Sequence, residues 1–137
     1  MEHLKIIPRP TNETKVYWEA CQQQKLLIQQ CKECEHIQFY PRLMCTKCSC
    51  REVDWIEACG LAKVLTYTIV HRPILPAYQK VAPYILAVVQ LDEGPTMMTN
   101  IVNCPLDEIK CDMNVKVMFQ QWSDDFLVPV FEQYNYL

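Results

Sequence analysis

Two C-x-x-C pairs separated by ten residues, in the stretch CKECEHIQFYPRLMCTKC, constrain the fold of this 137-residue chain more than any other feature. The pairs are Cys31 with Cys34 and Cys45 with Cys48. Zn²⁺ prefers a tetrahedron of soft ligands, and two such knuckles brought together by hairpins supply four thiolates. The spacing therefore predicts one structural zinc per chain, which holds a small ribbon together.

Other interpretations of these cysteines are weaker. A redox motif would need one C-x-x-C at the start of a helix in a βαβ unit, and neither pair opens a helix here. The first residues, MEHLKIIPRP, lack the apolar region of a secretory signal, which predicts a cytoplasmic protein whose thiols stay reduced. Iron accepts the same four ligands, so a rubredoxin-like electron carrier stays open as an alternative. His36 is a weaker alternative ligand than any of the cysteines.

The rest of the chain is predicted to be mainly β. A first helix is expected in TNETKVYWEACQQQ (residues 11–24), capped by Thr11 or Asn12, because an apolar stripe recurs at helical spacing. The stripe consists of Val16, Tyr17, Ala20 and Cys21. A second, short helix is predicted over residues 103–113, because a cap residue, a proline and acidic residues follow one another there. Apolar alternation and β-branched residues predict strands over residues 25–30, 36–42, 51–60, 61–71, 84–91, 96–102, 115–122 and 127–134.

This order of elements predicts an N-terminal helix, a rubredoxin-like zinc ribbon and then a five-stranded OB-fold barrel. The expected limits are 1–28 for the helical segment, 29–58 for the ribbon and 59–137 for the OB-fold domain. A small open sandwich is the alternative fold. Pro129 is expected to mark the last strand as an edge strand. No stretch of the chain reaches the roughly 18 apolar residues of a membrane span.

Charge separates the two halves of the chain. Residues 1–50 carry seven Lys/Arg and five Asp/Glu, a net of +2, whereas residues 51–137 carry six and eleven, a net of −5. A single-stranded nucleic-acid module, the other function common to OB barrels and zinc ribbons, needs a basic groove. The acidic second half argues against nucleic acid as a partner.

The remaining cysteines are expected to be mostly small buried side chains. Cys104 is a weak candidate nucleophile, since a helix start would lower the pKa of its thiol. His71 is its only plausible partner and lies on another predicted strand. The sequence therefore offers no convincing catalytic set of its own.

The chain resembles a known family, the acyl-CoA-associated OB-fold proteins with a rubredoxin-like zinc ribbon. The resemblance covers nearly the whole chain and is carried by YWEACQQQKLLIQQCKEC, YPRLMCTKC, ACGLAKVLTYTIVHRP, PYILAVVQLDEGPTMMTN and PLDEIKCDMNVKVMF. Its knuckles usually place Gly after the second cysteine, because that position prefers φ > 0. Glu35 and Ser49 stand at these positions here.

The resemblance implies a non-catalytic accessory subunit. Members of the family pair with thiolase-fold proteins in thiolase, acyltransferase or aldolase-type complexes, which form or cleave C–C bonds in acyl-CoA thioesters. The catalytic Cys and His, and the bound CoA thioester, then belong to the partner, in an assembly with two copies of each subunit. Tyr17, Trp18 and the C-terminal FEQYNYL are the surfaces expected to be buried in such a complex.

The loop HRPILPAYQKVAP (residues 71–83) is the expected place for contact with CoA, because ligands of OB folds bind at loops of the barrel mouth. Arg72 and Lys80 could pair with CoA phosphates, beside His71. Tyr78 or Tyr84 could stack on the adenine ring. The hypothesis is that this loop closes over the CoA entrance of the partner.

Overall fold

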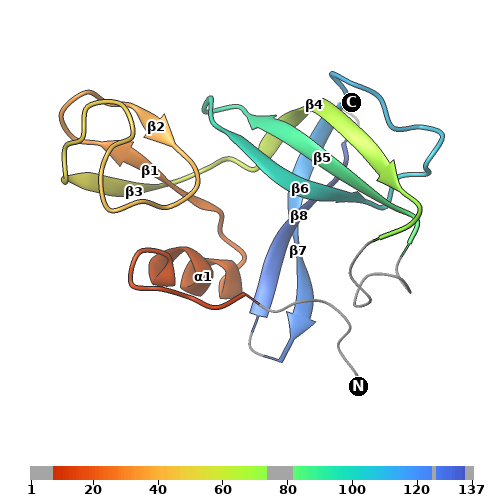
Figure 1. Cartoon of the computed structure of the whole chain (residues 1–137), viewed down its shortest axis with the longest axis horizontal. Coiled ribbons are helices and arrows are strands. Elements are labelled where there is room, and N and C mark those ends of the chain that lie inside the picture. The colour runs from red at the N-terminus through yellow and green to blue at the C-terminus, as the bar shows by residue number, and fades with distance from the viewer. Residues whose placement is uncertain (1–7, 74–81, 125, 135–137) are drawn as a thin grey trace.

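The computed structural model describes residues 8–73, 82–124 and 126–134 and shows a small ribbon beside a barrel, with a short helix between them (Figure 1). The helix is α1 (Lys15–Gln22). The ribbon contains β1 (Leu27–Cys31), β2 (Ile37–Gln38) and β3 (Val53–Glu57). The barrel contains β4 (Leu61–Val70), β5 (Tyr84–Leu91), β6 (Thr96–Val102), β7 (Asn114–Ser123) and β8 (Phe126–Gln133). The predicted fold class is therefore confirmed.

Helix α1 begins later than predicted. Its N-cap is Thr14, not Thr11 or Asn12, because the chain first makes a turn in which Thr11 N donates to Thr14 Oγ1 at 2.8 Å. Three residues of the predicted stripe are buried, while Val16 remains 40% exposed. The buried three are Tyr17, Ala20 and Cys21.

The barrel closes in the order β4-β5-β6-β8-β7, with β6 and β8 parallel and the other neighbours antiparallel. Closure is short, since β4 pairs with β7 only over Leu61–Lys63. Alternate side chains of β5 fill the interior, as a period of two requires. Those side chains are Ile85, Ala87, Val89 and Leu91.

The predicted helix over residues 103–113 is wrong. The segment makes a single turn, in which Glu108 N donates to Pro105 O, and positive φ angles at Asn103 (52°) and Asp112 (68°) interrupt helical geometry at both ends. Its backbone also bonds to the barrel, where Asp112 N donates to Val64 O at 2.7 Å. Long-range pairing with β4 thus replaces the local helix.

Pro129 does not mark an edge strand, so that prediction is also wrong. Strand β8 has β7 on one side and β6 on the other. The β6 pairing reaches only Phe131 and Glu132, however, so it ends before the proline. A residue without an N–H is tolerated there because no ladder bond to β6 is required of it.

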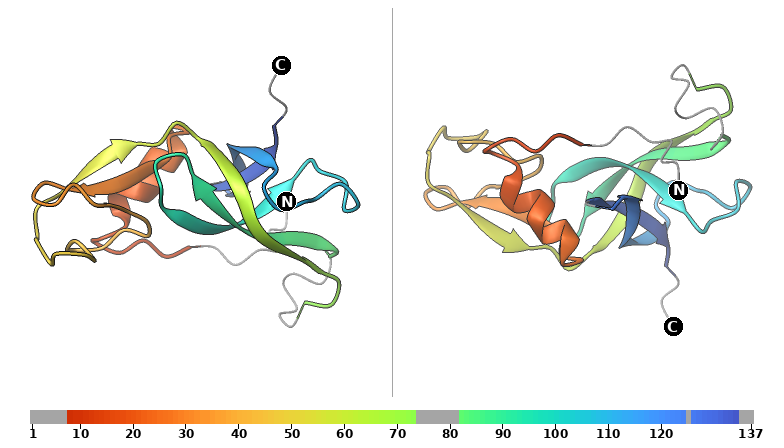
Figure 2. Two further views of the ribbon diagram at one scale, coloured as in Figure 1. Left: turned by 90° about the horizontal axis from the view of Figure 1, so that it is seen from above. Right: turned by 90° about the horizontal axis from the view of Figure 1, so that it is seen from below.

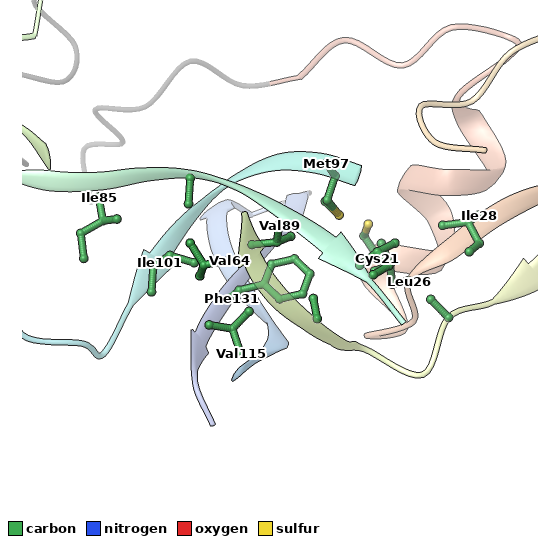
Figure 3. Packing of buried hydrophobic residues seen from close by; sticks show 14 of the residues in the cluster. Cys21, Leu26, Ile28, Val64, Ile85, Val89, Met97, Ile101, Val115 and Phe131 are labelled. Atoms are coloured by element: carbon green, nitrogen blue, oxygen red, sulfur yellow. The ribbon is translucent and has the colours of Figure 1, made fainter. Parts of the chain in front are cut away.

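The ribbon, the helix and the barrel share one apolar core (Figure 3). Cys21, at the end of α1, and Leu26, just before β1, belong to the same buried cluster as the barrel residues Met97 and Phe131. Seen from above and below, the ribbon and the barrel occupy opposite ends of the long axis (Figure 2). Gly60 forms the junction with φ +88°, and a Cβ there would lie 2.7 Å from Val117 Cγ1.

Aromatic rings connect the three parts. Trp18 of α1 meets Phe126 of β8 with 6.0 Å between ring centroids, and Tyr17 meets Phe39 and Tyr40 of the ribbon at 5.7 and 5.9 Å. Tyr17 is only 2% exposed, and the start of the C-terminal segment, Phe131, lies in the barrel core. Tyr17 and Phe131 are thus already covered within the chain, which leaves little of either side chain for a partner.

No helix within the described residues combines the length and the apolar character needed to cross a bilayer.

Candidate metal centre

The four cysteines of the two C-x-x-C pairs converge at one end of the ribbon. Their Sγ atoms all lie within 4.8 Å of one another, with 3.5 Å between Cys31 and Cys48 and 3.5 Å between Cys34 and Cys45. Zn–S bonds of about 2.3 Å in a tetrahedron would separate the sulfurs by about 3.8 Å. The donor set therefore fits a tetrahedral zinc with only small shifts, and none of the four is in a disulfide.

The two knuckles have the same backbone hydrogen bonds, offset by fourteen residues. In the first, Glu35 N donates to Cys31 O at 3.1 Å, and in the second Ser49 N donates to Cys45 O at 3.0 Å. Cys31 N and Cys45 N in turn donate to the carbonyls of His36 and Cys50, at 2.9 and 2.8 Å. Each pair of ligands is thus held by a closed turn of the same form.

Both turns need a left-handed residue after the second cysteine. Glu35 has φ 63° and Ser49 has φ 66°, so both residues adopt the backbone conformation for which such knuckles usually have Gly. The chain therefore keeps the usual knuckle geometry with side chains that adopt it at a cost.

Backbone N–H groups favour the thiolate at the first cysteine of each pair. The N–H of Cys34, together with that of Glu33, lowers the pKa of Cys31 to about 6. At Cys45, burial opposes ionisation, but the N–H groups of Cys48 and Lys47 outweigh it and lower the pKa. At Cys48 the N–H of Cys50 also lowers the pKa, but the hydrogen bond with Cys31 and burial outweigh it and raise the pKa to about 12. Thiolates are the form that binds a metal, so these turns are arranged to bind one.

The site is closed. Four thiolates fill the tetrahedron, so a zinc bound here keeps no position for a substrate. Among the described residues, the group able to hold an ion comprises these four cysteines and does not include His36. Such a site cross-links the ribbon and is not suited to hydrolysis or redox chemistry on a substrate.

A buried pair of glutamines, which the sequence analysis did not single out, holds the loop that carries Cys45. Gln29 and Gln38 lie opposite each other on β1 and β2 and are 3% and 5% exposed. Gln29 binds both backbone groups of Arg42: its Nε2 donates to the carbonyl at 2.9 Å, and its Oε1 accepts from the N–H at 2.8 Å. Gln38 Oε1 accepts from Thr46 N at 2.9 Å.

The side-chain amides of Gln29 and Gln38 make the hydrogen bonds to this loop that the backbone of a neighbouring strand would otherwise make. This pairing fixes the start of the second knuckle. The sequence gives no signal that singles this pair out, because β1 also contains Gln30, which is not buried.

Three of the five residues expected to contact CoA are described, and they lie at the far end of the β4–β5 pair. His71 and Arg72 follow β4 and are exposed, and Tyr84 opens β5 opposite Val70. The structure thus brings His71, Arg72 and Tyr84 to one end of the barrel, away from the cysteines. Tyr78 and Lys80 lie outside the described residues.

Cys104 does not have the properties expected of a nucleophile. No helix begins there, and burial, followed by the charges of Glu108 and Asp107, raises the pKa of its thiol. Of the other cysteines outside the cluster only Cys21 is buried, so the expectation that most of them are buried is wrong.

Comparison with known proteins gives two family matches. Residues 18–54 match the sequence model described as "ChsH2, rubredoxin-like zinc ribbon domain", and residues 55–120 match "ChsH2, C-terminal OB-fold domain". The two matches together cover most of the chain and agree with the ribbon and the barrel seen in the structure.

Individual relatives carry names of enzymes and scaffolds. A "DUF35 domain-containing scaffold protein" of Methanocaldococcus jannaschii is 32% identical over 79% of this chain and 77% of its own length. A "probable enoyl-CoA hydratase alpha subunit" of Thermomonospora curvata is 34% identical over 90% of this chain, but the chain spans only 39% of that relative. Among solved structures, a chain of the "Ltp2-ChsH2(DUF35) aldolase" superposes with a TM-score of 0.83 at 31% identity, covering 93% of this chain and 98% of the other.

Proposed function

Because this chain belongs to the DUF35 family of proteins that join a ChsH2-type rubredoxin-like zinc ribbon to an OB-fold domain, we propose that it is a non-catalytic subunit of a thiolase-fold enzyme. The enzyme acts on acyl-CoA thioesters and forms or cleaves a C–C bond. This chain stabilises the partner and shapes the entrance for CoA.

One observation carries the proposal. The ribbon, the helix and the barrel together superpose on 98% of a chain from an aldolase whose description pairs Ltp2 with ChsH2. A match over a single OB fold would support only a fold, since OB barrels serve many functions. A match over the whole arrangement, at 31% identity, also supports a similar position within an assembly.

The metal centre supports a structural role for the ribbon. Cys31, Cys34, Cys45 and Cys48 would hold one zinc, which supplies a cross-link between the two knuckles. The ribbon sheet is small, and β2 has only two residues. A bound metal therefore contributes folding free energy that the short sheet cannot supply alone.

The second part of the proposal is that this chain contacts the CoA bound by the partner. The exposed Arg72 lies at the end of the barrel where β4 ends and β5 begins, beside His71. A guanidinium there would pair with a phosphate of CoA held by the partner. Tyr84, at the start of β5, is the described aromatic residue nearest to this position along the sheet pairing and would pack against the nucleotide.

Co-expression with the thiolase-fold protein of the same genome tests the proposal. We expect a stable complex with two copies of each chain, measured by light scattering after size-exclusion chromatography. A soluble chain that remains monomeric and elutes apart from this protein would contradict it.

Steady-state kinetics of that complex then test contact with CoA. Arg72→Ala should raise KM for the acyl-CoA more than it lowers kcat, as expected when uniform binding is lost. Lys63→Ala, an exposed cation elsewhere on β4, serves as the control. Equal KM values for the two variants would show that Arg72 does not contact CoA.

A further inference from the structure

The loop from Tyr40 to Met44 presents apolar side chains to solvent at the edge of the ribbon. Leu43 is 65% exposed, Tyr40 39% and Met44 38%. Single exposed apolar residues are ordinary on protein surfaces. Three within five consecutive residues, beside a buried metal-ligand cysteine, form a local apolar surface that needs an explanation.

The loop cannot turn these side chains inward, because buried glutamine side chains hydrogen-bond to its backbone. Gln29 binds both the N–H and the carbonyl of Arg42, at 2.8 and 2.9 Å, and Gln38 Nε2 donates to Met44 O at 3.2 Å. Cys45, the next residue, is buried in the metal cluster. The backbone polar groups therefore point into the ribbon, and the side chain of Leu43 is left outside.

Such a loop loses little conformational entropy when something binds to it. Ordering of loops and side chains is a main cost of association, and a surface that is already fixed avoids part of that cost. The buried glutamines are therefore positioning residues for this surface as well as for the metal site.

Charges identify the kind of surface that would cover the loop. Arg42 and Lys47 flank Leu43 and Met44, and both are exposed. The described residues supply no ion pair for either cation, since the recorded ion pairs are Lys15–Glu19 and Lys32–Asp54. An apolar centre between unpaired cations is complementary to an apolar pocket bordered by carboxylates.

We infer that the Tyr40–Met44 loop, with Arg42 and Lys47, is a docking surface for the thiolase-fold partner, inserting Leu43 into an apolar pocket with an acidic rim. The inference rests on the proposed function, because it assigns this surface to the same partner. It goes beyond that function by placing part of the contact on the ribbon, at the opposite end of the molecule from the end of β4 that His71 and Arg72 follow (Figure 1).

Affinity for the purified partner, measured by biolayer interferometry with the zinc-loaded full-length chain, tests the inference. Leu43→Ser should raise Kd by about tenfold or more, as loss of a central apolar anchor does. Arg42→Glu should lower the association rate about fivefold, and the effect should shrink at high salt.

Matched controls lie on the barrel. Met98 is 67% exposed on β6, so Met98→Ser removes an apolar side chain of similar exposure. Lys63→Glu reverses an exposed charge on β4. Both should leave Kd within about twofold of the wild-type value, the usual limit for residues outside an energetic centre. Zinc content and circular dichroism verify that every variant is folded.

The outcomes separate this inference from the proposed function. If the wild-type chain binds the partner and Leu43→Ser and Arg42→Glu bind equally well, the docking surface is wrong and the proposed function remains. If the wild-type chain does not bind, both are wrong. If Leu43→Ser instead abolishes self-association of the isolated chain and leaves partner affinity unchanged, a second copy covers the loop and the assignment to the partner is overturned.

Discussion

Gln38 donates a hydrogen bond from Nε2 to Oε1 of Gln29, 2.8 Å away, across the β1–β2 pair of the ribbon. Both side chains are buried, and their other donors and acceptors hold the loop that leads to Cys45. The buried Gln29–Gln38 pair thus helps to fix the position of Cys45, one of the four metal ligands.

Gln38→Leu should destabilise the ribbon by about 2 kcal/mol, because Thr46 N, Met44 O and Gln29 Oε1 lose hydrogen bonds that contribute about 0.5–1.5 kcal/mol each. Zinc should also dissociate faster in a competition with a chelator. Gln30→Leu is the control, since the bond from Gln30 to Glu35 O is exposed and long at 3.3 Å. Equal zinc release by the two variants would show that the buried amides do not position the site.

The purified chain should contain about one zinc, as a closed four-ligand site requires. Elemental analysis by mass spectrometry measures it. Cys34→Ser should lose the metal and unfold the ribbon while the barrel stays folded, whereas Cys59→Ser, an exposed cysteine outside the cluster, should keep the metal. A red, iron-containing protein, or a ribbon that remains folded without metal, would overturn the zinc assignment.

Glu35→Gly and Ser49→Gly should each stabilise the zinc-loaded chain by about 0.5–1 kcal/mol. Left-handed backbone geometry costs a residue with a side chain about 1–2 kcal/mol. Gly avoids this cost, and the larger conformational entropy that it loses on folding cancels only part of the gain. Urea unfolding measures the change. Lys47→Gly, within the second knuckle but outside the positions with positive φ, should destabilise it. Loss of stability in both Gly variants would mean that the side chains at these turns matter more than their backbone angles.

The strands and the metal site could be predicted from the sequence because their signals are local. The segment of β5 is nearly all apolar, which identifies it as a central strand, and the structure then places every second side chain in the interior. The spacing of the four cysteines likewise specifies which thiols meet. The positive φ values of Glu35 and Ser49 are not predicted from the sequence, because neither residue is the Gly that usually marks such a turn.

The features that the sequence did not predict correctly depend on contacts between distant segments. The sequence of residues 103–113 contains a valid helix signature, but Asp112 N pairs with Val64 O, and no local pattern indicates this. Gln29 is buried because a loop thirteen residues further along the chain folds over it. Polar residue type alone predicts exposure, so the buried amide pair could not be identified in advance.

Stability should fall as the pH rises above about 9. Burial raises the pKa of Cys21 to about 12 and that of Tyr17 well above its ordinary value. An unfolded thiol ionises near pH 8.5–9, so above this pH the unfolded state binds fewer protons than the folded state and is favoured. The loss begins at the unfolded pKa and ends near the folded pKa.

Between pH 8 and pH 10.5 the free energy of unfolding should decrease by about 2 kcal/mol through Cys21 alone, at about 1.4 kcal/mol for each unit of pKa shift. Urea unfolding at the two pH values measures it. Cys21→Ala removes this group and should flatten the dependence. A stability that is constant or that rises over this range would contradict the burial of Cys21 and Tyr17.

Turnover of an acyl-CoA thioester by the purified complex tests the non-catalytic role most directly. Two altered complexes are compared with the wild type: one in which the catalytic cysteine of the thiolase-fold partner is replaced by Ala, and one in which this chain carries Cys104→Ala. We predict that kcat falls by about 10³-fold or more in the first, as expected for loss of a nucleophile. In the second, kcat should stay within about twofold, since Cys104 is held as a neutral thiol by burial and its acidic neighbours. Turnover that survives the partner's substitution but is lost with Cys104→Ala would place the chemistry in this chain and contradict its role as an accessory subunit.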